Sequence, residues 1–227
     1  MSGYEWDFVI VLRDFDLLLL GLLNTLKVTG LALLFGVPLG LAMAQLRLYA
    51  PWPIRIPVGF VIEFLRTTPP IAQLFWFFFA LPILIGVEID PFRAAVLTFS
   101  LQSSAFFAEV FRAGIQSIDS GQWEAAKALG MDRNRTLRRI ILPQAVKRMI
   151  PAFLERAIEL MKTTTLVSAI SYADLLYQAN SIAQSTYRTI EVYTVAAALY
   201  FAVIFLCSLL VRRLEKRLAR SGETLMH

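Results

Sequence analysis

The sequence predicts an all-α membrane protein with five transmembrane helices. Hydrophobic residues make up 57% of the 227-residue chain, whereas soluble domains contain roughly 45–50%. Spanning a bilayer takes about 20 helical residues, and the clearest uncharged stretches of that length occupy 28–46, 67–87 and 192–211. The pattern of apolar runs and loops places the five helices at roughly 18–46, 56–86, 92–117, 144–170 and 189–211.

Basic residues lie where they orient a membrane protein. The net charge is +5, and fourteen Lys and Arg residues follow the first, third and fifth predicted helices, against three in the alternate segments. Cytoplasmic loops carry this excess, so we expect the N-terminus outside and the C-terminus in the cytoplasm. Because these residues flank apolar spans, we expect no nucleic-acid partner. The expected organisation is an external segment 1–17, a transmembrane domain 18–215 with a cytoplasmic loop 118–143, and a cytoplasmic tail 216–227.

The first three helices contain local features that affect packing. Gly36 and Gly40 in the first helix form a small-xxx-small pair suited to close helix contact, although chance explains such a pair equally well. Thr67 and Thr68 precede two prolines that interrupt the second helix, so this kink either lines a transport path or bends the chain for packing. Ser103 and Ser104 in the third helix either hold helices together or line a route.

Charges within the predicted spans need partners, because a charge at the bilayer centre costs about 2.5–3.5 kcal/mol on insertion scales. Two pairs, Glu63 with Arg66 and Glu109 with Arg112, have i,i+3 spacing and are expected to neutralise each other. We expect these pairs to anchor the helices near the membrane boundaries.

The fourth helix has a charged face. Glu155, Glu159 and Lys162 fall at i, i+4 and i+7, so this face is expected to point into protein or a water-filled cavity. One hypothesis is that the two glutamates contact a cationic substrate group while Thr163 or Thr164 supplies a hydroxyl. The rival, slightly favoured interpretation is a structural ladder of ion pairs that holds two membrane helices together.

The cytoplasmic loop is predicted to hold two short helices with a glycine joint. Asp119 can cap the first helix, with Gln122 as a capping-box-like partner, and Gly130 suits the left-handed residue past its end. Asp132 can cap a second helix over 133–142, which we expect Pro143 to end. The thin, alanine-rich first helix favours docking into a groove of a partner. The alternative is an amphipathic helix on the membrane surface, which the arginines of the second segment make plausible.

From Phe64 to about Leu214 the chain resembles permeases of the polar amino acid ABC importer family. The resemblance rests on five segments in the same order: Leu65–Pro69, Ala108–Gly114, Gly121–Gly130, Leu142–Ala145 and Lys162–Val167. It implies the type I ABC importer permease fold, in which the loop helix meets the ATPase subunit. The departures at Thr67, Glu155 and Thr163, where glycine, asparagine and aspartate are common in the family, leave the carried amino acid open.

Carried over residue by residue, the resemblance assigns ATPase coupling to five positions: Gly121, Glu124, Ala125, Ala126 and Gly130. It also implies the partners, which are ABC ATPase subunits, a second permease subunit and a solute-binding protein. The implied place is the bacterial inner membrane.

The chain has no Gly-x-x-x-x-Gly-Lys-Ser/Thr phosphate loop, so ATP and magnesium are expected on the partner ATPase and no enzymatic activity on this chain. With one Cys and one His, no metal site is expected. The predicted function is the transmembrane subunit of an importer for a polar amino acid or related zwitterion. The alternatives are a stand-alone secondary transporter or channel, and a membrane scaffold whose loop recruits another protein.

Overall fold

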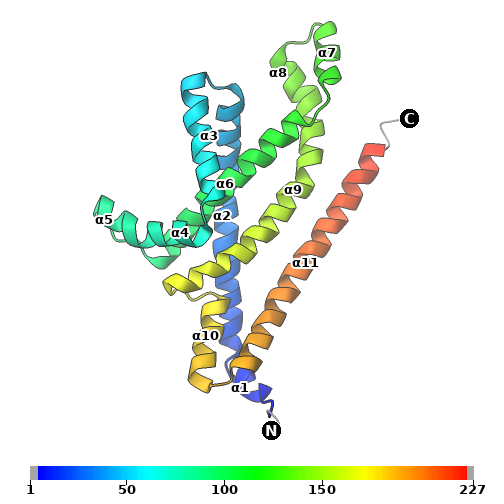
Figure 1. Ribbon diagram of the computed structural model, residues 1–227. Helices are drawn as coiled ribbons and strands as arrows, with labels where there is room; N and C mark the ends of the chain where they lie inside the picture. The colour runs from blue at the N-terminus through cyan, green and yellow to red at the C-terminus, as the bar shows by residue number, and fades with distance from the viewer. Residues whose placement is uncertain (1–4, 224–227) are drawn as a thin grey trace. The chain divides into compact units, whose positions relative to one another are not determined.

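The computed structural model describes residues 5–223, with side chains as far as Arg213, and this part of the chain is helical without a strand. In chain order the elements are α1 (Phe8–Arg13), α2 (Phe15–Tyr49), α3 (Trp52–Thr67), α4 (Pro70–Phe75), the π-helix η1 (Trp76–Ala80), α5 (Leu81–Ile85), α6 (Pro91–Gln116), α7 (Ser120–Ala128), α8 (Arg133–Thr136), the π-helix η2 (Leu137–Ile141), α9 (Leu142–Thr163), the 3-10 helix η3 (Thr164–Ile170), α10 (Leu175–Thr186) and α11 (Thr189–Glu223) (Figure 1). The last four residues of the predicted tail 216–227 lie outside the described part.

The chain divides into two compact units that share its long helices. Unit 1 comprises Met1–Leu34, Thr68–Ser100 and Ile158–Ser208, and unit 2 comprises Phe35–Thr67, Leu101–Ala157 and Leu209–His227.

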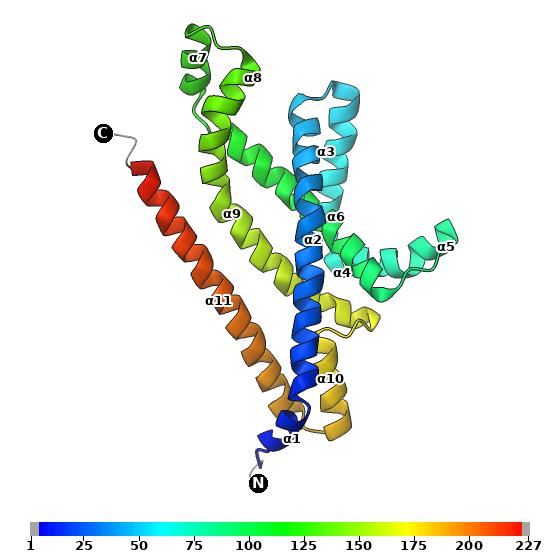
Figure 2. The same ribbon diagram turned by 180° about the vertical axis from the view of Figure 1, so that it is seen from behind.

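Unit 1 has two buried clusters of apolar side chains. In the first, residues of α2, α4 and α6 pack with the end of α9 and η3, around Phe99, Leu74 and Val28. In the second, α10 lies beside the N-terminal part of α2 and the start of α11, as Figures 1 and 2 both show. Gly21 makes this approach possible, because a Cβ there would lie 2.8 Å from the Cα of Leu175.

Unit 2 is built on a helical hairpin and a crossing helix. The helix α3 returns beside the C-terminal part of α2 (Figures 1 and 2), and Ile62 and Leu65 of α3 pack with small residues of α2 and α6. Gly40 lies against α6, where an added Cβ would come within 2.6 Å of the carbonyl oxygen of Ser104. The close-packing role predicted for the glycine pair is therefore confirmed for Gly40.

The broken second helix is confirmed, and its free carbonyl has a local partner. The break falls at Thr68 and Pro69, between α3 and α4. Within unit 1, the side-chain amide of the buried Gln73 donates to the carbonyl oxygen of Thr68 at 3.1 Å. Within unit 2, the Thr67 hydroxyl donates to the carbonyl oxygen of Glu63 at 2.9 Å. The carbonyl oxygens of Thr68 and Glu63 thus each accept from a side chain close to the break.

Two expectations about element boundaries were wrong. The predicted helix 144–170 is α-helical only to Thr163 and continues as the 3-10 helix η3. The segment between the fourth and fifth predicted helices contains an unexpected helix, α10, whose N-cap Asp174 accepts a hydrogen bond from the Tyr177 amide at 2.9 Å.

Among the described residues, three helices are long and apolar enough to span a membrane: α2, α6 and the part Thr189–Arg213 of α11. The pair formed by α3 and the helical stretch to Ile85 qualifies as a fourth, broken span. The helix α9 is not among these candidates. It carries six charged residues, which lower its apolar character.

Candidate functional site

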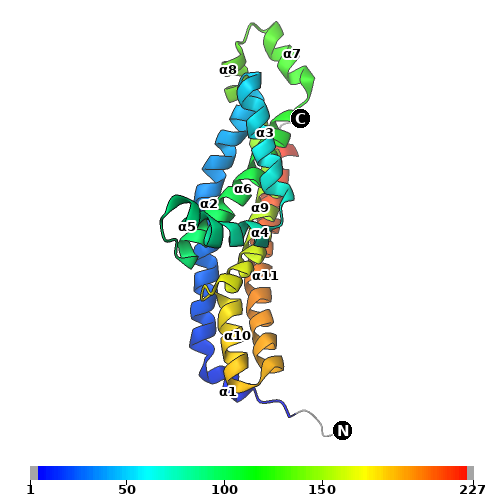
Figure 3. The same ribbon diagram turned by 60° about the vertical axis from the view of Figure 1, so that its left-hand side comes forward.

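The loop between α6 and α9 forms the predicted pair of short helices, which lie together in Figures 1 and 3. The Asp119 side chain caps α7 by accepting from the Gly121 amide at 2.7 Å. The helix ends in a Schellman motif, in which the Met131 amide donates to the Ala126 carbonyl at 3.0 Å and Gly130 has φ +73°. Both predicted ends of α7 are confirmed: Asp119 caps its start, and Gly130 follows its end.

The predicted capping-box role of Gln122 is wrong. The Gln122 side chain does not bond to the backbone amide of the N-cap residue Asp119. Its side-chain oxygen accepts from the Gln144 amide at 3.4 Å, and the same Gln144 group donates to the Ile140 carbonyl at 3.0 Å. Gln122 therefore links α7 to the start of α9.

One face of α7 is buried against the loop and the other is free. Trp123 packs on a cluster of Ile118, Ile141, Ala145 and Met149, and Ala126 is 1% exposed. Of the other predicted coupling residues, all are exposed: Gly121, Glu124, Ala125 and Gly130. Four of the five predicted positions thus lie on the free side, whereas Ala126 holds the helix to its support.

An exposed leucine extends the free side of α7. Leu129, the C-cap residue, is 80% exposed, which is unusual for a leucine in a polar loop. Leu129 follows Ala126 by three residues, so helical spacing alone would place it near the buried side, and sequence reasoning did not single it out. An exposed apolar group beside exposed alanines suits an interface better than a solvated loop.

The helix continues through Pro143, so the break predicted at this proline is wrong. Asp132 caps α8 as predicted, accepting from the Arg135 amide at 2.9 Å. The chain then continues through η2 into α9, and the Leu142 amide donates to the Leu137 carbonyl in the wider π pattern. The proline follows this π turn directly. The wider π turn leaves room for the proline ring, and the missing amide hydrogen of Pro143 is tolerated there. The second loop helix therefore runs into α9 without interruption.

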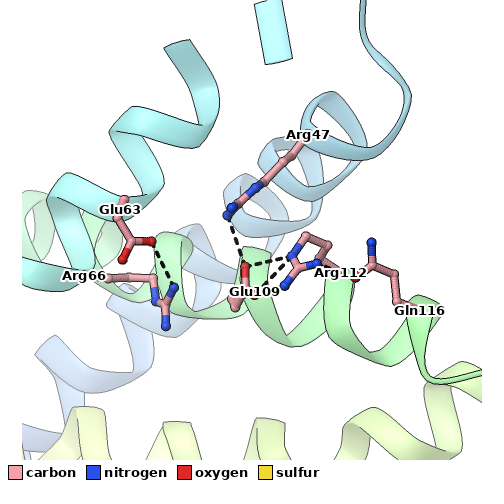
Figure 4. Close-up of polar contacts among 6 residues, drawn as sticks. All are labelled: Arg47, Glu63, Arg66, Glu109, Arg112 and Gln116. Carbon is pink, nitrogen blue, oxygen red and sulfur yellow. Dashed lines mark hydrogen bonds and ion pairs between the residues drawn. The ribbon is translucent and has the colours of Figure 1, made fainter. Parts of the chain in front are cut away.

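An ion-pair network lies where α2, α3 and α6 of unit 2 meet (Figure 4). Both predicted i,i+3 pairs form: Arg66 lies 3.3 Å from Glu63, and Arg112 binds both carboxylate oxygens of Glu109. Arg47 of α2 also donates to Glu109, at 3.1 Å. The contact from Arg47 joins two helices that are distant in sequence, and no spacing rule predicts it.

A groove of about 430 Å³ lies between α6 and α9 in unit 2. Its lining brings together acidic and basic groups, including Glu109, Glu155, Arg66 and Arg156. The guanidinium groups of Arg66 and Arg156 lie 5.7 and 4.7 Å from the centroid of the Phe106 ring. Of the predicted path residues, Glu155 lines this groove. Sequence reasoning did not single out Phe106 or the role of the two arginines around it.

The remaining predicted path residues fall into two groups. Ser103 and Ser104 are buried in α6, and the Ser104 hydroxyl donates to the Leu101 carbonyl at 2.7 Å. In unit 1, Thr164 is buried, and its hydroxyl lies 3.1 Å from that of Thr29 and donates to the Met161 carbonyl. The Ser104 and Thr164 hydroxyls thus donate to carbonyls one turn earlier in the chain, and Thr164 also contacts Thr29 of α2.

Other predicted residues of α9 are more open. Glu155, Glu159 and Lys162 are all exposed on the isolated chain. Thr163 at the end of the helix donates to the Glu159 carbonyl at 2.9 Å. Apolar helices of spanning length, a charged helix face and a capped, exposed loop helix are features expected of a membrane transport subunit.

Comparisons with known proteins give the family. Residues 36–220 match the binding-protein-dependent transport system inner membrane component, and the chain belongs to this family. It is 37% identical over 221 residues to the L-cystine transport system permease protein TcyB of Bacillus subtilis, covering 96% of this chain and 93% of that protein. It is 32% identical over 212 residues to the arginine transport system permease protein ArtQ of the same species, covering 93% and 97%.

A solved structure agrees with this assignment. The "crystal structure of an amino acid ABC transporter with histidines" contains a chain that is 38% identical, with a TM-score of 0.90 over 94% of this chain and 100% of that one. The chain is therefore an ABC transporter permease subunit, a multi-pass component of the inner membrane, and ATP hydrolysis belongs to separate subunits. The family and location predicted from the sequence are confirmed.

Proposed function

We propose that this chain is the transmembrane subunit of an ATP-driven importer that carries a polar amino acid or a related zwitterion. The substrate arrives on a solute-binding protein, and a separate ATPase that holds ATP and magnesium supplies the energy. The relatives named above, permeases for L-cystine and arginine, support the substrate class. The observation that carries the coupling proposal is α7, a capped helix with its anchored face on Trp123 and Ala126 and its other face free.

The proposed topology has five spans, with the N-terminus outside. Three helices and the broken pair are the candidates for four of these spans. We take α9 as the fifth, because it follows the loop of α7 and its charges can face protein or water. The distribution of Lys and Arg then puts α7 and α8 in the cytoplasm, where an ATPase can reach them. The helix α10 falls on the opposite, external side.

The substrate path is proposed along the charged face of α9. A zwitterion needs an acidic and a basic contact, and the groove in unit 2 offers Glu155 together with Arg66 and Arg156. The exposed Glu159 and Lys162 extend the face along the same helix. A second permease subunit, identical or homologous, is proposed to cover this face, because lipid does not accept it.

The rival role of this face is a ladder of ion pairs that holds two permease helices together, without contact to substrate. Glu155→Gln separates the two roles, measured as substrate affinity in the assembled transporter with normal ATPase activity. A contact predicts a weaker affinity, by roughly tenfold for a lost charged hydrogen bond. An unchanged affinity contradicts a contact between Glu155 and the substrate.

The stand-alone transporter or channel is less well supported, because it gives no role to α7. The test is uptake by proteoliposomes that contain the permease with its ATPase and binding protein. Glu124→Lys on the free side of α7 is expected to abolish uptake while leaving the spans folded. Glu88→Lys, the same change at an exposed residue outside the loop, is the control and is expected to keep uptake. Uptake without the ATPase, or normal uptake by Glu124→Lys, contradicts the proposal.

A further inference from the structure

A second groove, separate from the proposed path and coupling residues, lies in unit 2 where the α2–α3 hairpin meets the C-terminal end of α6. Its volume is about 420 Å³. The lining is strongly basic and consists of Arg47, Leu48, Arg55, Ile56, Gly59, Arg112 and Gln116. No acidic side chain lines it.

The positive charge of this groove is only partly compensated. Glu109 behind it binds both Arg47 and Arg112, so one carboxylate serves two guanidinium groups. Arg55 is exposed and makes no ion pair with any of the side chains that the structure describes, residues 5–213. Three cations against one anion leave a surplus positive charge that faces the groove.

The residues around the groove are of the kinds found at the surface of a membrane. Tyr49 and Trp52 at the α2–α3 turn are 42% and 67% exposed, and these aromatic residues are typical of the interface between lipid and water. Farther along α3, Ile56 and Phe60 are 51% and 71% exposed. The basic groove therefore lies between an exposed aromatic edge and an exposed apolar surface of α3, an arrangement that suits the boundary between lipid and water.

Gly59 leaves the groove open. It lies on α3 and lines the groove, and an added Cβ would have one neighbour within 4 Å, the Nε atom of Arg47 at 3.9 Å. The space next to the Arg47 guanidinium is thus free for a ligand group. A larger side chain at this position would fill it without changing any charge.

We propose that this groove binds the phosphate of an anionic phospholipid such as phosphatidylglycerol. Arg55, Arg47 and Arg112 donate to the phosphate oxygens, and the acyl chains lie along the exposed apolar face at Ile56 and Phe60. Basic pockets between membrane helices are suited to anionic head groups, and arginine is well matched to phosphate geometry. The bound lipid bridges the α2–α3 turn and the end of α6, close to where α6 enters the loop of α7. The proposal does not depend on the identity of the transported substrate or on the orientation of the chain.

The test is native mass spectrometry of the transporter complex in detergent, titrated with phosphatidylglycerol or with phosphatidylethanolamine of the same acyl chains. Arg55→Gln removes the cation that has no partner among the described residues, and Gly59→Leu fills the groove with all charges kept. Arg139→Gln, at an exposed arginine away from the groove, is the matched control. Loss of one arginine near the head group is expected to weaken phosphatidylglycerol binding about fivefold.

The expected result is weaker phosphatidylglycerol binding by both groove variants, no change for Arg139→Gln, and little binding of phosphatidylethanolamine by the unchanged protein. Equal losses for Arg55→Gln and Arg139→Gln overturn the proposal, since they indicate general attraction between charges. Displacement of phosphatidylglycerol by millimolar inorganic phosphate also overturns it, because the ligand is then a free anion. Unchanged binding by Gly59→Leu overturns the assignment of the groove itself.

Discussion

Asp174 gives a prediction whose size and pH dependence follow from the structure. This N-cap of α10 is completely buried. Its carboxylate accepts from the Tyr177 amide at 2.9 Å and lies 3.5 Å from the Tyr200 hydroxyl, and Tyr172 is the other titratable group nearby. Burial, opposed by these hydrogen bonds, raises the pKa of Asp174 from its ordinary value of 3.8 to about 6.

A raised carboxyl pKa destabilises the folded protein at neutral pH. The stabilisation from this group is fully present below pH 3.8 and is lost as the pH rises through about 6. At 1.36 kcal/mol per pKa unit, the loss amounts to about 3 kcal/mol at pH 7.5. Asp174→Asn keeps a capping oxygen, and Asn caps about as well as Asp, but it cannot ionise. The variant is therefore expected to be more stable than the wild type at pH 7.5, with an advantage that shrinks toward pH 4.

The assay is thermal unfolding of the purified transporter at a series of pH values between 4 and 8. Asp119→Asn at the exposed cap of α7 is the control, since its carboxylate is not buried, and we expect its effect to be small and nearly independent of pH. A difference between Asp174→Asn and wild type that stays constant with pH, or that favours the wild type more at pH 7.5 than at pH 5, refutes the reasoning.

Three further predictions concern packing. Gly40→Ala is expected to destabilise the protein by about 1–3 kcal/mol through overpacking against α6, whereas Gly30→Ala, with nothing within 4 Å of its Cβ, is expected to be neutral; equal shifts in unfolding temperature contradict this. Gly130→Ala places a side chain at φ +73°, which costs roughly 1–2 kcal/mol of strain. We expect faster hydrogen exchange of the amides at the end of α7 and weaker coupling of ATP hydrolysis to uptake. An unchanged exchange rate argues against the Schellman motif at this end. Trp123→Ala removes the aromatic anchor of α7 and is expected to speed hydrogen exchange of this helix roughly tenfold, a local loss of stability of about 1.4 kcal/mol. The unfolding temperature of the spans is expected to stay within a few degrees of the wild type. Exchange as slow as in the wild type shows that other contacts hold the helix.

Features set by neighbouring residues were predictable from the sequence. The ends of α7 depend on Asp119 and Gly130, whose preferences act over one helical turn, and the i,i+3 pairs of Glu109 and Glu63 depend only on helical spacing. The break at Thr68 follows from two adjacent prolines. Each of these effects is local, so it appears in the sequence whatever the rest of the chain does.

Features that depend on tertiary contacts or on a changed helix type were missed. Pro143 normally ends a helix, but the π turn before it accommodates the ring, and no sequence rule specifies such a turn. The contact of Arg47 with Glu109 joins residues 62 positions apart, and the pairing of Arg66 and Arg156 around Phe106 brings together α3, α6 and α9.

The helix α10 did leave a signal. Asp174 is a good N-cap residue, and Leu175, Ala179, Ile182 and Ala183 are buried at helical spacing. The segment is short and lies between two expected spans, which favoured a loop interpretation. In a membrane protein, a capped amphipathic run of this length between spans is better taken as a helix than as a loop.

The most direct test of the central claim is chemical cross-linking from the free side of α7 in the assembled transporter. Ala125→Cys is introduced in a Cys207→Ser background, so that the added thiol is the only one in this chain, and Glu88→Cys serves as the control. The account predicts that Ala125→Cys cross-links to the ATPase subunit, with a yield that changes when ATP is added, and that Glu88→Cys does not. A Cys at Ala125 that labels freely with a water-soluble reagent in the active complex, and yields no ATPase cross-link, contradicts the account.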